Sequence, residues 1–425
     1  MRGGCVALGL LLLLAGPVRA DSDTVVINLA GDVGYPDGWE RVERVDRDKH
    51  RLFRLVKPII AGADLNFVNL ECPFTKTKPT VKKTYPMSCK PKRLGYVVRA
   101  GFNLFSLANN HTMDAGERGV LDTLANLRRL RRSKKRLWWA GTGADRARAM
   151  RGVRFRPPGK SFDITLFAVN SSSAKHVGSI YNRSLVKRVA RAAKRSVVLV
   201  SVHKGWEYYH VPQKDAVRKY RKLIDAGATL VIGHHPHVVQ GVERYKRGLI
   251  FYSLGNFSFG SYTTSNYARR ARMYSMIARV TLSKRAIKRA ELIPLYVGNK
   301  DPWVLRGETI PPRFATPQLL SGKFAKVALD EITTFTKNVP LPGKRPTRLI
   351  RVGDRALVYL GKRLSEADRE ASLMLQAAEW AHVKRLKATP RPATVRERKF
   401  RNTAGTPRYP WRHRLPKKRK DKRRK

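Results

Sequence analysis

Acidic residues are scarce in this chain of 425 residues, which holds 31 aspartates and glutamates against 88 lysines and arginines. The net charge of +57 attracts polyanions, so nucleic acid, anionic lipid, an envelope polymer and acidic polypeptides are the candidate partners. Charge of this kind says nothing about the fold. Hydrophobic residues make up 42% of the chain, enough for a core, which excludes a protein disordered as a whole.

Long apolar runs are also missing, apart from one near the N-terminus. Residues 6–15 are nearly all apolar, Arg2 precedes them, and Val18-Arg19-Ala20 supplies small residues suited to cleavage. This pattern predicts a secretory signal peptide over residues 1–20, cleaved near Ala20, with an uncleaved anchor as the alternative. The mature chain is then expected to have no transmembrane segment and to be exported to the periplasm, the cell envelope or the extracellular space.

Cysteine is rare as well, with three residues in the chain. Cys5 leaves with the signal peptide, so Cys72 and Cys89 remain as a pair. In an oxidising compartment such a pair predicts a disulfide bond, which would stabilise the fold by about 3 kcal/mol. Two unpaired buried thiols are the alternative.

Strand-like and helix-like segments alternate from Thr24 onward. Strands are expected at 24–30, 66–70, 103–108, 163–169, 196–203, 229–233, 249–254, 273–282 and 290–297, and helices at 117–131 and 214–226. This alternation predicts a layered α/β domain over residues 24–300, with a largely buried sheet.

The sequence after residue 300 contains no motif that indicates a chemical function. Residues 301–390 are expected to form a mixed appendage of unknown role, in which a capping box at Ser365 opens a helix that runs to about Lys387. Residues 391–425 contain 16 basic and 2 acidic residues and predict a disordered basic tail.

Polar motifs follow the expected strands at the points where those strands end. They are Gly31-Asp32, Asn69-Leu70-Glu71, Asn109-Asn110-His111, His203-Lys204-Gly205, Gly233-His234 and Gly255-Asn256. Ligands of open α/β sheets sit outside the carboxyl ends of the strands, so we expect these side chains to form one site. Imidazole, carboxylate and amide ligands together favour one or two divalent Zn, Mn or Fe ions over Ca or Mg.

The strings GDVG, NLECP, SLANNHTMDAG, HKGWEYYHVP, LIDAGATLVIGHHPHVVQGVERY and LIFYSLGNFSFG resemble the CapA family of capsule and poly-γ-glutamate synthesis proteins. That family is related to the calcineurin-like metallophosphoesterases, and the likeness runs from residue 24 to 261. It implies a layered metallophosphoesterase-like (calcineurin-like) sandwich with a metal site.

The resemblance also implies a role for individual residues. The implied metal ligands are Asp32, Glu71, Asn110, His203, His234 and His237. Among them, Asp32 and His237 would hold one metal, Glu71 would bridge, and the others would hold the second metal. His111 would be the catalytic acid. The parent superfamily has Asp-x-His at its first motif, whereas Val33-Gly34 follows Asp32 here, so the first metal has fewer ligands.

Four further residues, Asp114, Glu207, Tyr208 and Asn256, match the family strings. Asp114, Glu207 and Asn256 are interpreted as groups that orient the ligands, with helix-start or surface roles as the alternative for the two acids. His210 and His235 receive no role. A Cys72–Cys89 bridge would hold the lysine-rich loop 75–84 beside the metals. The loop would then attract an anionic substrate, or, as the alternative, it is a solvated loop that the bridge holds in place for structural reasons.

The function predicted from these features is a step in synthesis, release or export of an anionic capsule or envelope polymer. Poly-γ-glutamate and polysaccharide or teichoic-type polymers are the expected partners, together with other capsule-assembly proteins. A non-catalytic polyanion-binding component of an export apparatus is the alternative. A nucleic-acid-binding protein is less favoured, because it accounts for the charge but not for the signal peptide or the metal residues.

Overall fold

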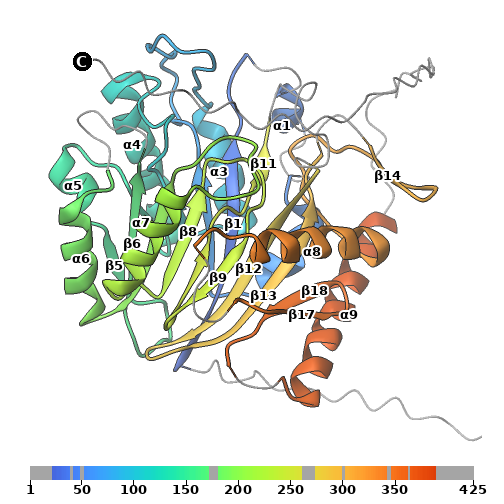
Figure 1. The fold of residues 1–425 in the computed structure, drawn as a ribbon. Coiled ribbons are helices and arrows are strands. Elements are labelled where there is room, and N and C mark those ends of the chain that lie inside the picture. Colours follow the sequence, from blue (N-terminus) through green and yellow to red (C-terminus); the bar gives the residue numbers. More distant parts are fainter. Residues whose placement is uncertain are drawn as a thin grey trace, which may run out of the picture. The chain divides into compact units, whose positions relative to one another are not determined.

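The computed structural model describes residues 22–38, 42–47, 52–171, 180–260, 273–298, 302–341, 346–361 and 364–388 (Figure 1). The predicted signal peptide and the predicted basic tail lie outside these described residues. Among the helices of the described part, none is both long enough and apolar enough to cross a membrane.

Two large sheets form the centre of the fold. The first has the order β17-β18-β13-β12-β1-β2-β3-β4, with β11 beside β1 and β16 beside β13. Its strands are β1 (Thr24–Gly34), β2 (Leu65–Leu70), β3 (Leu104–Ser106), β4 (Trp138–Ala140), β11 (Asn256–Phe259), β12 (Tyr274–Ser283), β13 (Ile287–Tyr296), β16 (Gln318–Leu319), β17 (Leu349–Val352) and β18 (Arg355–Val358).

The second sheet has the order β5-β6-β7-β8-β10-β9. Its strands are β5 (Val153–Phe155), β6 (Ile164–Asn170), β7 (Val197–His203), β8 (Leu230–His234), β9 (Val242–Tyr245) and β10 (Gly248–Phe251). A separate hairpin pairs β14 (Trp303–Leu305) with β15 (Glu308–Ile310).

Helices lie between and after these strands (Figure 1). They are α1 (Glu43–Arg47), η1 (Arg54–Val56), α2 (Lys57–Ala61), α3 (Pro91–Ala100), α4 (Gly116–Lys134), α5 (Arg146–Met150), α6 (Arg183–Ala193), α7 (Lys214–Asp225), α8 (Gly322–Lys337) and α9 (Glu366–Ala388).

Side-chain alternation along the strands sorts the apolar residues into layers. In β2, Phe67 belongs to a core that also contains Leu199 and Ile232 of the second sheet, so this core fills the space between the sheets. The next residue, Val68, points to the other side and packs in a cluster with Leu94 of α3 and Leu124 of α4. A third cluster joins the outer face of the second sheet to α6 and α7. The predicted layered α/β sandwich is therefore confirmed.

The C-terminal part continues the first sheet rather than forming a layer of its own. Strand β18 pairs with β13, and α8 contributes Phe324 and Leu329 to the core between the sheets. The predicted helix after Ser365 is α9, and its capping contacts are present. The Ser365 hydroxyl accepts from the Asp368 backbone N–H at 3.1 Å and donates to the Asp368 carboxylate at 2.6 Å.

Candidate metal centre

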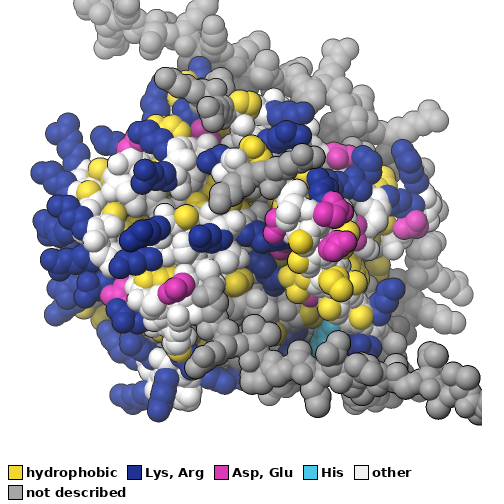
Figure 2. All heavy atoms as spheres, turned by 90° about the horizontal axis from the view of Figure 1, so that it is seen from below, with side chains coloured by type: hydrophobic (Ala, Val, Ile, Leu, Met, Phe, Trp, Pro, Cys, Tyr) yellow, Lys and Arg dark blue, Asp and Glu magenta, His cyan; other side chains and the backbone are white. Residues whose placement is uncertain are grey.

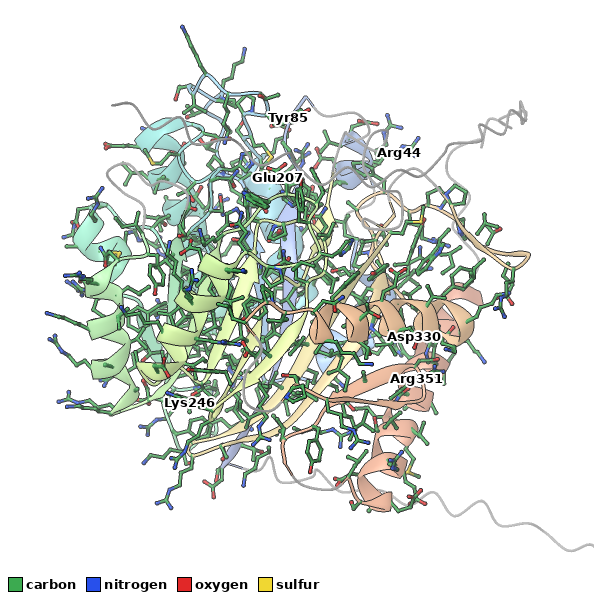
Figure 3. The ribbon with its side chains drawn as sticks, viewed as in Figure 1. Arg44, Tyr85, Glu207, Lys246, Asp330 and Arg351 are labelled. Atoms are coloured by element: carbon green, nitrogen blue, oxygen red, sulfur yellow. A yellow bond between two sulfur atoms is a disulfide. The ribbon has the colours of Figure 1, made fainter. Side chains whose placement is uncertain are left out.

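Polar side chains from both sheets meet where the parallel strands end. Strands β1 and β2 are parallel in the first sheet, and their register sets Asp32 beside Asn69. Strands β7 and β8 are parallel in the second sheet, and their register sets His203 beside His234. Figure 3 labels Glu207, on the loop that follows β7, at this end of the strands. The predicted gathering of the strand-end motifs is present in the structure.

Two glycines let the backbone reach this arrangement. A Cβ atom on Gly31 would lie 1.8 Å from the carbonyl oxygen of Gly255, and one on Gly233 would lie 1.9 Å from that of Tyr252. Neither position can carry a side chain. The close approach lets the Asp32 backbone N–H donate to the Gly255 carbonyl at 3.0 Å. The glycines that precede Asp32 and His234 therefore position these two side chains.

Asp32 and Glu71 are two fully buried carboxylates in the middle of the centre. His234 Nδ1 donates to Asp32 Oδ1 at 2.9 Å, and His237 Nε2 lies 3.6 Å from Glu71 Oε1. The Nδ1 atom of His237 lies 2.9 Å from Asn256 Oδ1 and 3.4 Å from Asp32 Oδ2. With Nδ1–H donated to Asn256, Nε2 of His237 keeps a lone pair that can bind a cation.

His203 and Asn110 lie on the other side of Glu71. The Nε2 atom of His203 is 3.4 Å from Glu71 Oε1 and 2.8 Å from Asn110 Oδ1. Asn69 holds this side together, because its amide nitrogen donates to Asp32 Oδ1 at 2.9 Å and lies 3.5 Å from His203 Nδ1. Imidazole and amide side chains from several segments of the chain thus lie around the carboxylates of Glu71 and Asp32.

Burial and neighbouring charges shift the pKa values in opposite directions. Burial favours the neutral form of Asp32, but hydrogen bonds and charge from His234 and His237 outweigh it and hold its pKa well below the ordinary value. Burial and the nearby Asp32 charge raise the pKa of Glu71 well above its ordinary value. Burial also lowers the pKa of His203 strongly, so its imidazole is neutral, which is the form that binds metals.

The donor set fits a divalent cation. Asp32 Oδ2, Glu71 Oε1, His234 Nε2 and His235 Nδ1 are buried and have no hydrogen-bond partner. Such groups are costly to bury unless something satisfies them. A cation between the carboxylates would offset their mutual repulsion and occupy these lone pairs, as oxygen and imidazole ligands do for Zn, Mn or Fe.

Three groups of three side chains bring candidate ligand atoms within 4.8 Å of one another in the described part of the chain. They are Asp32, Glu71 and His237; Glu71, His203 and His235; and Glu207, His235 and His237. Glu71 belongs to the first two, which agrees with the bridging position that the sequence implied for it. The groups contain His235, for which the sequence suggested no role. His234 falls outside them, but its Nδ1 donates to Asp32 and its buried Nε2 has no hydrogen-bond partner.

His235 and His237 adopt backbone conformations that are rare for residues with a side chain. Their φ angles are 95° and 59°, on either side of Pro236. Such strain persists only where the surroundings impose it, and it concentrates at functional sites. Burial lowers the pKa of His235 to about 3, so this imidazole too is neutral. The spacing His235-Pro236-His237 is the signal that could have identified His235 from the sequence.

His111 stands beside the centre in a chain of polar contacts. Its Nδ1 lies 2.7 Å from Asp114 Oδ2, and Lys83 Nζ lies 2.6 Å from Asp114 Oδ1 and 2.9 Å from His111 Nδ1. Because an ammonium group only donates, the Asp114 carboxylate accepts from both neighbours. Burial, and secondarily the Lys83 charge, lowers the pKa of His111 although Asp114 opposes the shift. Lys83 is a residue that sequence reasoning placed only in a basic loop.

The predicted disulfide bond joins Cys72 to Cys89. It follows Glu71 directly and closes the loop that carries Lys83, and the backbone N–H of Thr75 donates to the Cys89 carbonyl at 2.9 Å. His210, the other histidine without an assigned role, bonds the Val239 carbonyl through Nδ1 at 2.7 Å and stacks on Phe335. It belongs to none of the three ligand groups.

Replacing both Cys72 and Cys89 by alanine should lower the free energy of unfolding by about 3 kcal/mol, because the open loop regains entropy in the unfolded chain. Urea unfolding of the mature protein measures this. Reduction of the wild-type protein with dithiothreitol should shift its midpoint in the same direction. An unchanged midpoint in both experiments would contradict a stabilising bridge.

The packed sheets and the buried carboxylate–imidazole centre define a layered α/β protein with side chains that could hold divalent metal. The chain belongs to the family described as "Bacterial capsule synthesis protein PGA_cap", whose sequence profile matches residues 26–261. The resemblance found in the motifs is thereby confirmed.

Individual relatives agree with this membership. The chain is 30% identical over 261 residues to the capsule biosynthesis protein CapA of Bacillus anthracis, covering 57% of this chain and 62% of that protein. It is 27% identical over 310 residues to the PGA biosynthesis protein CapA of Bacillus subtilis strain 168, covering 69% and 77%. The chain thus spans about three fifths of the length of the B. anthracis relative.

Among solved structures, TT1561 of Thermus thermophilus is similar over 62% of this chain and all of that one. The identity is 8% and the TM-score is 0.36, which is too low to bear on fold or function.

Proposed function

We propose that this protein is exported and uses a metal-dependent phosphoesterase-type site in the synthesis, release or export of an anionic capsule or envelope polymer. The observation that carries this proposal is the pair of fully buried carboxylates, Asp32 and Glu71, with partnerless lone pairs among imidazoles. The names of the two CapA relatives support the capsule or poly-γ-glutamate context. The Cys72–Cys89 bridge supports an oxidising compartment outside the cytoplasm.

In this proposal Glu71 is shared by two ligand groups. Asp32 and His237 complete one group, and His203 and His235 complete the other, with Asn110 beside His203. His234 donates from Nδ1 to Asp32 at 2.9 Å and keeps a buried Nε2 without a hydrogen-bond partner, so it can orient Asp32 and also act as the ligand that the family resemblance implies. Glu207 supplies a further carboxylate within ligand distance of His235 and His237.

A divalent cation bound at this centre would supply positive charge that polarises a phosphoryl oxygen and makes water a better nucleophile. The side chains of the protein would then transfer protons and hold the substrate in position. Hydrolysis joins a water oxygen to phosphorus and breaks the bond to the leaving alcohol, whose oxygen takes a proton. The attacking water gives up a proton to solvent. His111, in its protonated form held by Asp114, is the proposed donor of the proton to the leaving oxygen, while Lys83 brings positive charge toward an anionic substrate.

The test is metal analysis of the purified mature protein together with a hydrolysis screen. Aryl phosphates, teichoic-type polymer and poly-γ-glutamate are the substrates. We expect one or two equivalents of Zn, Mn or Fe, and hydrolysis that a chelator abolishes and added metal restores. Protein that binds none of these metals would contradict the metal centre. Metal without hydrolysis of any substrate would favour the second candidate function.

That second candidate is a non-catalytic polyanion-binding component of an export apparatus, and a basic cavity favours it. The cavity has a volume of about 550 Å³, and its described lining includes a single carboxylate, that of Asp368. Its basic lining residues are Arg244, Lys246, Arg247, Arg285, Lys288 and Arg289. Figure 3 labels Lys246 at the opposite end of the strands from Glu207. A concave site lined by one sign of charge concentrates the field on an anionic ligand.

A further inference from the structure

Helix α9 buries three polar side chains and exposes three consecutive apolar ones, although Val383 and part of Trp380 also pack inward. Ser372, Gln376 and Glu379 are buried against the first sheet. Leu373, Met374 and Leu375 are 46%, 75% and 39% exposed. Seen from below, hydrophobic side chains gather beside acidic ones on a surface that elsewhere is rich in lysine and arginine (Figure 2).

Hydrogen bonds from the buried polar side chains fix the rotation of this helix. Ser372 donates to Glu291 at 2.8 Å, and Gln376 donates to the Val352 carbonyl at 3.0 Å. The Gln376 side chain also accepts from the Asp354 backbone N–H at 3.0 Å. The helix cannot turn its apolar side inward without leaving these buried groups unpaired, which is costly.

Glu379 adds a buried ionic anchor to the same face of α9. Its carboxylate binds Arg279 at 3.0 Å and also contacts Arg355. Breaking such a buried pair leaves an uncompensated charge in the interior. The outward orientation of Met374 is therefore built into the fold.

The outward face is narrow and made of small residues around one large one. Helical periodicity places Ala377, Ala378 and Ala381 with Met374 on the side opposite to the buried polar residues, and the three alanines are exposed. Small side chains let another helix approach closely, and Met374 can fill the space left above an alanine.

The charges at the two ends of this face are opposite in sign. Glu366 and Glu370 are exposed near its start, and Lys384 and Arg385 are exposed near its end. An antiparallel copy of the same helix would set each acidic end against a basic end and Met374 against Ala381. A parallel copy would set like charges together, and an anionic membrane would repel the acidic end.

We propose that the exposed face of α9 binds the α9 face of a second copy of this chain, antiparallel, in a symmetric homodimer. The interface is isologous, because the same face serves both partners. The alanines pack at its centre, and the opposite charges at its ends select the orientation.

The first test is the oligomeric state of the full mature protein by analytical ultracentrifugation at physiological salt. We expect a dimer that dissociates on dilution, and a monomer for the double variant Met374→Glu with Ala378→Glu. Circular dichroism should report unchanged folding, because both positions are exposed. A wild-type monomer at about 100 μM would overturn the proposal, and so would a dimer that persists in the double variant.

Charge exchange provides the second test. Glu366→Lys with Glu370→Lys, and separately Lys384→Glu with Arg385→Glu, should each weaken the dimer about tenfold or more. An equimolar mixture of the two variants should restore dimers, because one helix is then basic throughout and the other acidic.

Lys187→Glu with Arg191→Glu on α6 makes the same change in net charge as Lys384→Glu with Arg385→Glu, so it is the matched control for that variant and should leave the dimer unchanged. A mixture that stays monomeric would overturn the antiparallel arrangement. Binding of a monomeric wild type to anionic vesicles, lost on Met374→Glu, would assign this face to a membrane and also overturn the proposal. The dimer is measured without substrate, so these results are independent of the proposed hydrolysis.

Discussion

His111→Ala is expected to keep the bound metal and to lower hydrolysis about 10²–10⁴-fold, the usual effect of losing a general acid. The reason is the division of labour in the site. His111 is hydrogen-bonded to Asp114 and belongs to none of the three groups of candidate ligands. Metal analysis and initial rates on one phosphoester with a poor leaving group measure the two quantities. The deficit should shrink for substrates with a good leaving group, which need no protonation.

Glu71→Gln should instead lose metal and hydrolysis together. Glu71 joins two ligand groups, and glutamine keeps its shape while removing the charge that offsets a cation. His210→Gln is the matched histidine control, because His210 bonds the Val239 carbonyl and belongs to none of the three ligand groups found in the described residues. Stoichiometric metal in a triple alanine variant of His203, His235 and His237 would refute the centre. Loss of metal on His111→Ala would refute the separate acid role.

Affinity for a linear polyanion should fall steeply with salt, about 10³–10⁵-fold between 50 and 200 mM if the polymer makes six to ten ionic contacts. The cause is release of condensed counterions by the basic residues of the cavity and the tail. Fluorescence anisotropy with labelled poly-γ-glutamate, teichoic-type polymer and DNA, matched in charge, measures the slope. Deleting residues 391–425 should flatten the slope without abolishing binding, because that segment holds only 16 of the 88 basic residues.

Neutralising the cavity should have a larger effect than neutralising an open helix surface. Arg244→Gln, Arg285→Gln and Lys288→Gln remove three charges that face one concave volume. Arg128→Gln, Arg132→Gln and Lys135→Gln remove three exposed charges at α4 and serve as the control. Glu71→Gln should bind the polymer as tightly as wild type. Equal losses in both triple variants would contradict a role for the cavity, and absence of binding at low salt would contradict polymer binding altogether.

The site was largely predictable because its motifs lie at strand ends. Hydrophobic and β-branched runs predicted β1, β2, β7 and β8. The polar residues at the ends of these runs meet because β1 and β2 are parallel, and so are β7 and β8. Only the tertiary contacts, however, show what each of the neighbouring histidines binds. His234 reaches Asp32 across 202 residues of sequence, and the strained turn at His235 brings the next ring to the ligand groups.

The sequence by itself determined the layered α/β class, the family, the cysteine pair that forms the bridge and the set of strand ends that build the site. All of these follow from local periodicity, residue type and motif order. Only the tertiary structure decided that Lys83 reaches His111 and that α9 exposes Leu373, Met374 and Leu375 while it buries polar side chains. The second outcome contradicts what hydrophobicity alone would predict for a helix. It arises because buried Glu291, Arg279 and Arg355, all on the sheet, require polar partners, and α9 supplies them with Ser372 and Glu379.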